Sequence, residues 1–349
     1  MGENKRLSYI DAAKGIAVLL VIFGHCFRQS MRTDFYWCDY SYLYVYRFHV
    51  TLLFVLSGMG YSLTREKNLS LGTGAYIKKK AKSLLLPWFS YSVIIYLVFA
   101  ILWLIAPVRE LLDSSAYKFI APADFFRAII YNENPYCFHV WYLQTLFFFT
   151  VFAFLTEKYL GKKAFLVIAA VLIVLSPALY SLYFETANWA LKGFFQKLPF
   201  FLIGILLTDR MIKKHEKALL FSGIAAALAE GAFIMSKAAF SGAAAILAGY
   251  AENIVILFIC LGIIAFCSHF ENRLSKFSAF GKSTLPYYLY HQPFCCAFLG
   301  IVLYEKLNIN AVLTVIICFA SSIAVPKAVL WIFKKTGIGK LFQKIGLPA

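Results

Sequence analysis

Long apolar runs, separated by short polar or basic stretches, follow one another along the whole chain. Each run has about 20 residues, the length that an α-helix needs to cross a hydrocarbon core of roughly 30 Å. No long polar stretch is left over, so the pattern predicts a single all-α, polytopic membrane domain over residues 1–349. We expect about ten transmembrane helices, at residues 9–29, 44–63, 85–106, 139–157, 164–182, 192–208, 217–235, 250–268, 284–304 and 309–333.

Composition supports a membrane protein. Hydrophobic residues make up 61% of the chain and charged residues 15%, and the mean hydropathy is +0.73. A soluble domain has about 45–50% apolar and about 25% charged residues. The formal net charge is +17, but a nucleic-acid-binding domain needs a basic face on a soluble fold. Here the cations lie in short loops, so we expect the lipid bilayer as a partner and no nucleic acid.

The distribution of the cations predicts the topology. Most of the 34 Lys and Arg residues lie in segments that share one side of the membrane if both termini are cytoplasmic, as the positive-inside rule requires. The first apolar run contains Asp11 and Lys14 and no small-residue cleavage site follows it. We therefore interpret it as a retained helix and not as a signal peptide.

Two connections and the cysteines bear on function. The outer connection 107–138 contains prolines, acidic residues and aromatics, which favours an ordered lid that walls an acceptor site. The inner segment 76–86 carries four lysines directly before an apolar run, as in a juxtamembrane basic helix. The eight cysteines have no metal-ligand spacing, so we predict no metal site. Cys38 and Cys137 both fall on the predicted outer side and either pair or remain free.

The first helix carries ionisable residues inside an apolar run. Asp11 and Lys14 are neighbours on one helical face, where pairing would lower the cost of each in lipid. Lys14 and His25 lie about three turns apart on the same face, at an axial separation of roughly 16 Å, and Arg28 extends this stripe. A histidine at this depth is able to exchange a proton or act as a nucleophile. A buried structural pair and a packing histidine are the alternative.

Three more positions are candidate site residues. His49 stands near the start of the second helix, where an interfacial histidine is as good an interpretation as a functional one. Trp141 and Tyr142 open the fourth helix, where aromatic residues also serve as interfacial anchors. Close to His49, Gly58 is small enough to let two helices approach closely.

The ninth helix contains His291 followed by Gln292 and Pro293. A proline inside a span frees a backbone carbonyl that another group must satisfy. His291 is therefore a further candidate site residue. Glu230 and Glu252 also lie in apolar surroundings, and we interpret them as members of structural polar pairs.

Taken together, these residues resemble the membrane-bound acyltransferase family 3, which includes acetylases of bacterial surface and exported polysaccharides. Six segments are similar to the family's motifs, in the family's order, over nearly the whole chain. They are Arg6 with Asp11-x-x-Lys14-Gly15 and Gly24-His25; FVLSGMGYSL (54–63); the lysine cluster with SLLLPW (83–88); HVWYL (139–143); FFLIG (200–204); and STLPYYLYH (283–291).

The resemblance implies a membrane enzyme of a bacterial cell membrane that uses acetyl-CoA or another acyl-CoA as co-substrate, with no bound cofactor. The acceptor would be a hydroxyl of a carbohydrate or lipid-linked glycan at the outer face. Lys14 would take the cationic role often filled by Arg, and His25 that of the essential histidine. The family's Arg-x-x-Arg motif would be represented by Lys79 and Lys82, which offer point charges and no bidentate fork. The chain ends soon after the last span, so we expect the stand-alone form that lacks the hydrolase-like domain of some relatives.

The resulting hypothesis is acyl transfer with His25 as general base or, less favourably, as transient acyl carrier. Asp11 and Lys14 would orient groups or stabilise developing charge. The expected substrate-binding residues are Arg6, His49, Lys79, Lys82, Trp141, Tyr142 and His291. A transporter of a small anionic or acylated solute is the alternative, because buried charges also suit a proton-coupled carrier. The pattern predicts nothing about oligomeric state.

Overall fold

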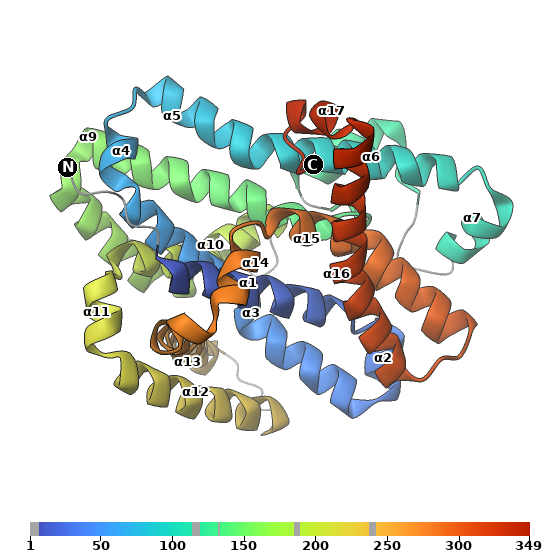
Figure 1. The fold of residues 1–349 in the computed structure, drawn as a ribbon. Coiled ribbons are helices and arrows are strands. Elements are labelled where there is room, and N and C mark those ends of the chain that lie inside the picture. Colours follow the sequence, from blue (N-terminus) through green and yellow to red (C-terminus); the bar gives the residue numbers. More distant parts are fainter. Residues whose placement is uncertain (1–6, 114–118, 132, 185–188, 237–241) are drawn as a thin grey trace.

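The computed structural model describes residues 7–113, 119–131, 133–184, 189–236 and 242–349, and every regular element in these ranges is a helix. This confirms the all-α prediction for the described part of the chain. Figure 1 shows the helices gathered in one bundle, with α1 (Ser8–His25) in its interior. Helix α1 contacts α3, α13 and α14 along its length.

Within the described residues, seven helical segments are long and apolar enough to cross a membrane. Two of them combine several elements: 73–102 joins α5 (Thr73–Lys80), η1 (Ala81–Leu85) and α6 (Leu86–Leu102), and 138–183 contains α9 (Trp141–Leu179). The chain is therefore a multi-span membrane protein. The other five are α1, α3 (Tyr36–Leu63), α12 (Glu216–Ser236), α13 (Gly242–His269) and α16 (Ala311–Thr336).

The remaining predicted spans also fall in helices. The predicted spans 139–157 and 164–182 fall mainly in α9, on either side of Gly161, whose φ of 80° and ψ of 168° are not helical, and their outermost residues fall in η3 and η4. The span 192–208 corresponds to α10 (Trp189–Leu206). The span 284–304 is divided among α15 (Leu285–Tyr290), η6 (His291–Phe298) and η7 (Ile301–Lys306). The count of ten spans and the cytoplasmic side of both termini stay predictions.

The first predicted span, 9–29, was too long. Helix α1 ends at His25, and Arg28 has extended backbone (φ −68°, ψ 152°) before the next helix begins. Arg28 therefore does not continue the helical face of His25 and instead pairs with Glu305, its Nη2 3.1 Å from Oε1. The short helices are α2 (Gln29–Asp34), α4 (Arg65–Leu69), α7 (Ala106–Asp113), η2 (Pro122–Asp124), α8 (Phe125–Ile130), η3 (Phe138–Val140), η4 (Tyr180–Phe184), α11 (Asp209–Lys214), η5 (Glu271–Arg273), α14 (Ser275–Gly281) and α17 (Gly339–Lys344).

Glycines allow the closest helix contacts. A Cβ on Gly58 of α3 would lie 2.1 Å from the Phe201 carbonyl oxygen, and one on Gly204 of α10 would lie 2.2 Å from that of Val55. The close approach predicted at Gly58 is thus confirmed, and two of the motif segments, 54–63 and 200–204, meet there. Such backbone contact gives dispersion energy where lipid offers no hydrophobic driving force.

The eight cysteines are all free and buried. Cys38 and Cys137 do not pair, and Cys137 Sγ lies 3.5 Å from Ser92 Oγ. A free thiol in such a setting behaves as a small apolar group.

Candidate active site

A cavity of about 510 Å³ lies where α1, α3, α9, α10 and α13 meet α15 and η6. In the predicted topology, the end of α1 and the beginnings of α3, α9 and α10 all face outward, so the cavity belongs to the outer half of the membrane. Besides histidines, its walls combine aromatic with polar and charged side chains. They are Tyr42, Tyr46, Tyr136, Trp141, Tyr142 and Tyr288, and Arg47, Lys192, Gln196, Lys197, Glu252 and Asn253.

His25 reaches this cavity from the last residue of α1. Its Nδ1 lies 2.9 Å from the Tyr46 hydroxyl. The Tyr46 ring fits there because residue 24 is glycine, and a Cβ at Gly24 would lie 3.0 Å from that ring. The Tyr46 hydroxyl orients the imidazole through Nδ1, and the His25 ring also lines the cavity.

The broken helix near residue 293 holds a second histidine. Pro293 has no N–H, so the Leu289 carbonyl, four residues earlier, lacks its usual helical donor. His139 Nε2 takes that place at 3.1 Å from the Leu289 oxygen. Gln292 departs from helical backbone (φ −116°, ψ 150°), as expected for a residue before proline. The carbonyl that Pro293 frees therefore holds His139 in position. In the sequence, His139 belongs to the motif segment 139–143 and was not predicted as a site residue.

His291 completes a group of three histidine rings. Its ring centroid lies 5.2 Å from that of His25 and 5.0 Å from that of His139, and the His25 and His139 centroids are 6.4 Å apart. His291 Nδ1 bonds the Tyr287 carbonyl at 3.0 Å, whereas its ring lies behind His25 and does not line the cavity. Among the described residues, no group of three His, Cys, Asp or Glu side chains has a geometry that could hold a metal ion.

Hydrogen bonds to carbonyls settle which nitrogens carry protons. A carbonyl oxygen only accepts, so the bonded nitrogens of His139 and His291 are N–H donors, and so is Nδ1 of His49, 2.7 Å from the Val45 oxygen. His25 is the member of this group whose ring nitrogen meets a hydroxyl, which either donates or accepts. His25 is therefore the histidine best placed to change protonation during a reaction.

Trp141 and Tyr142 form an aromatic wall beside the histidines. Tyr142 exchanges a hydrogen bond of 2.8 Å with Ser57 of α3. Trp141 covers Gly193 of α10, where a Cβ would lie 2.8 Å from the indole ring. Both side chains line the cavity, as predicted for substrate-contacting residues.

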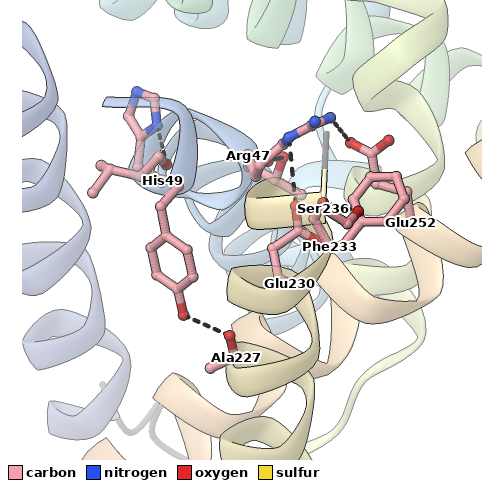
Figure 2. Close-up of polar contacts among 10 residues, drawn as sticks. Arg47, His49, Ala227, Glu230, Phe233, Ser236 and Glu252 are labelled. Atoms are coloured by element: carbon pink, nitrogen blue, oxygen red, sulfur yellow. Dashed lines mark hydrogen bonds and ion pairs between the residues drawn. The ribbon is translucent and has the colours of Figure 1, made fainter. Parts of the chain in front are cut away.

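Charged residues from four helices lie in or next to the cavity wall. Arg47 of α3 lies between two carboxylates, with Nε 3.4 Å from Oε1 of Glu230 on α12 and Nη1 bonded to Glu252 on α13 (Figure 2). Lys197 of α10 is buried and donates to the Thr51 hydroxyl at 3.0 Å. The two carboxylates were predicted to sit in structural polar pairs; they pair with Arg47, and Glu252 also faces the cavity.

The other predicted site residues lie elsewhere. Lys14 Nζ is 3.9 Å from Asp11 Oδ1, which confirms the expected pairing, but neither residue lines the cavity. Lys79 and Lys82 are exposed on the α5–η1 segment, where Lys79 donates to Asn68. Arg6 lies outside the described residues.

Sequence reasoning missed Tyr46, Gln196, Lys197 and Tyr288 as site residues. For Lys197, the available signal was its place inside an apolar segment, FFQKLPFFLIG, because a lysine in a span usually faces a cavity or a partner. For Tyr288, the available signal was its place in the motif segment 283–291. Tyr46 gave no signal, since a chain with 22 tyrosines offers many equivalent positions.

Comparison with known proteins bears directly on this site. A family model described as an acyltransferase domain matches residues 7–331. The chain belongs to the acyltransferase 3 family. The match covers α1 with His25 and continues through most of α16, so all the helices around the cavity lie inside it. The protein is therefore a membrane acyltransferase.

One curated relative is similar over a short stretch. The nodulation protein NolL of Mesorhizobium japonicum is 30% identical over 116 residues, which cover 32% of this chain and 30% of that protein. The match thus spans less than a third of the relative's length. No solved structure matches the chain significantly.

Proposed function

We propose that this protein transfers an acetyl group from cytoplasmic acetyl-CoA to a hydroxyl of a carbohydrate acceptor at the outer face of a bacterial cell membrane. The observation that carries the proposal is the cavity in which His25 faces aromatic and hydrogen-bonding side chains within the acyltransferase fold. An acyltransferase needs a base beside the attacking hydroxyl and a chamber that keeps water from the thioester.

In the proposed reaction, His25 acts as the general base. Its imidazole takes the proton of the acceptor hydroxyl while the hydroxyl oxygen attacks the thioester carbonyl carbon. The tetrahedral intermediate then collapses, the carbon–sulfur bond breaks, and the departing thiolate takes the proton from the imidazolium. The products are the ester and free CoA. Tyr46 would hold the imidazole in position through its 2.9 Å bond to Nδ1.

The cavity walls suit a sugar. Tyrosine and tryptophan rings offer apolar faces for ring C–H groups, and the side chains of Gln196, Glu252 and Asn253 offer donors and acceptors for hydroxyls. Pro135 and Tyr136, from the end of the connection 107–138, also line the cavity. This supports the expectation that the connection helps to bind the acceptor.

The donor would approach from the opposite side of the membrane. Lys79 and Lys82 are exposed near the start of the segment 73–102 and would contact the CoA phosphates as point charges. The pantetheine arm would then follow α1 past Lys14 towards His25, about three helical turns away. Asp11, paired with Lys14, would orient that amine.

The test measures where a labelled acetyl group is found after the reaction. Purified protein in vesicles receives acetyl-CoA labelled in the acetyl group on one side and a panel of methyl glycosides on the other. We expect labelled ester on a glycoside and a matching amount of free CoA. Intact acetyl-CoA crossing the membrane, or a glycoside crossing it unmodified, would instead identify a transporter. Absence of labelled ester with every glycoside would overturn the carbohydrate acceptor.

A further inference from the structure

A second cavity lies beside the candidate active site. It measures about 300 Å³ and is formed by Ala229 and Phe233 of α12 and by Ala248, Ala251 and Val255 of α13. We call it the α12–α13 crevice. Two carboxylates, Glu230 and Glu252, complete its lining, and Glu252 also lines the active-site cavity. The two spaces therefore share one lining side chain.

The crevice lies along α12 and α13, to one side of a close contact between two glycines. Near one end the helices meet at Gly223 and Gly262, where a Cβ on Gly223 would lie 2.5 Å from the Gly262 Cα. Further along, the crevice is lined by Ala229 of α12 and by Ala248 and Ala251 of α13. Small side chains such as these leave space between two packed helices that larger side chains would fill.

The crevice lies at the perimeter of the bundle that faces lipid. Both helices turn large apolar side chains outward, each more than half exposed. They are Phe221, Ile224, Leu228 and Met235 on α12 and Leu247 and Ile254 on α13. In a membrane protein, such exposed apolar side chains contact hydrocarbon. A molecule in the crevice therefore comes from the bilayer.

The polarity changes along the path from crevice to cavity. The crevice walls are almost wholly apolar apart from the two carboxylates, and these are held by Arg47 on the cavity side (Figure 2). Beyond Glu252 the lining becomes polar and aromatic. A molecule with a hydrocarbon chain joined to a polar head fits this order. From the lipid inwards, it would meet the apolar crevice, then the ion pairs of Arg47 with the two carboxylates, then the polar cavity. A free sugar gains nothing from the apolar part.

We propose that the α12–α13 crevice binds the hydrocarbon chain of a lipid-linked acceptor, so that its sugar head passes Glu252 and reaches His25. The proposal rests on the proposed function, because it names the class of acceptor for the same site. In this proposal, the Arg47–Glu230–Glu252 group lies where the hydrocarbon chain of the acceptor joins its sugar head. The acceptor then reaches the site sideways from the bilayer, without crossing an aqueous mouth.

The experiment compares two acceptors that share one sugar. The sugar accepted in the glycoside panel is supplied as its methyl glycoside and as its dodecyl glycoside in vesicles, with acetyl-CoA as donor. We expect a higher kcat/KM for the dodecyl glycoside. Ala251→Phe fills the crevice from an exposed position on α13, and we expect it to lower kcat/KM for the dodecyl glycoside about tenfold and to leave that for the methyl glycoside unchanged.

Ile254→Phe is the matched control, because it adds an aromatic ring to the lipid-facing side of the same helix outside the crevice. We expect this variant to change kcat/KM for neither glycoside. Ala248→Phe, about one turn earlier on α13, should repeat the result of Ala251→Phe. Equal kcat/KM for both glycosides in the wild type, or an equal loss with both in the filled variants, would overturn the crevice proposal alone. Failure of the wild type with every sugar would overturn the proposed function itself.

Discussion

The two ends of α1 use ionisable residues in different ways. At the beginning of the helix, Asp11 and Lys14 pair with each other, and the backbone packs so closely on α14 that a Cβ on Gly281 would lie 1.7 Å from the Asp11 carbonyl oxygen. At the end of the helix, His25 faces a cavity of about 510 Å³ and lies beside two other histidine rings. At the beginning of α1 the face towards α14 is closed by packing, whereas the end of the helix is open to a ligand. An ionisable residue in a span thus marks a special position without saying whether that position is structural or chemical.

The largest expected effect tests the open end. His25→Asn keeps an amide that can bond the Tyr46 hydroxyl but removes the titratable nitrogen. We expect acyl transfer to fall about 10²- to 10⁴-fold, the usual contribution of general acid–base catalysis. The measurement is initial rate with labelled acetyl-CoA and the accepted glycoside, at equal amounts of folded protein.

His139→Gln is the matched control for that loss, because its amide can still donate to the Leu289 carbonyl. We expect this variant to keep most of the activity. Undiminished transfer by folded His25→Asn would remove His25 from the chemistry and break the contrast between the ends of α1.

A smaller effect tests the closed end. Gly281→Ala places a methyl group against the Asp11 carbonyl, which forces α1 and α14 apart. We expect a loss of stability of about 1–3 kcal/mol, as for other overpacked sites, measured as a lower unfolding temperature in detergent. Activity per folded molecule should stay near that of the wild type.

Gly249→Ala is its control, because nothing lies within 4 Å of a Cβ at that position. We expect unchanged or slightly raised stability there, since alanine favours helix more than glycine does. Loss of activity in Gly281→Ala without loss of stability would show that the contact between α1 and α14 takes part in the reaction.

The smallest effect concerns the donor. Replacing Lys79 and Lys82 by Ala removes two exposed charges, and because exposed ion pairs contribute little, we expect KM for acetyl-CoA to rise only about fivefold, with kcat unchanged. The rise should shrink at high salt, where screening weakens the same contacts in the wild type.

Lys334 and Lys335, exposed in the last turn of α16, give a control pair with the same loss of charge. Their replacement should leave KM unchanged. An equal rise in KM in both double variants would indicate a general effect of surface charge and no specific phosphate contact at Lys79 and Lys82.

Several features of the site were predictable from local chemistry. A proline inside a span must free a carbonyl, and Pro293 does so at Leu289. A glycine in a transmembrane helix lets a neighbouring helix pack closely against it, as Gly58 does. Both predictions concern the backbone within one helix, where hydrogen bonding depends on residues four positions apart.

Other features depended on contacts between distant segments. The partner of the Leu289 carbonyl is His139, 150 residues away in the chain. The carboxylates of Glu230 and Glu252 both pair with Arg47, across separations that no helical period relates. The predicted extension of the Lys14–His25 stripe to Arg28 was wrong, because α1 ends at His25 and Arg28 pairs with Glu305.

The sequence by itself determined that most of the chain lies in lipid, that its regular structure is helical and which family it resembles. Lipid leaves the backbone few ways to satisfy its hydrogen bonds, so apolar runs of this length must be helices, and ordered motifs along the chain identified the acyltransferase resemblance. Only the tertiary structure decided that His25 meets His139 and His291, that Lys14 stays outside the cavity, and that Glu252 lines both the cavity and the α12–α13 crevice. Those outcomes depend on how helices rotate and tilt against one another, which is set by side-chain packing between segments far apart in the chain.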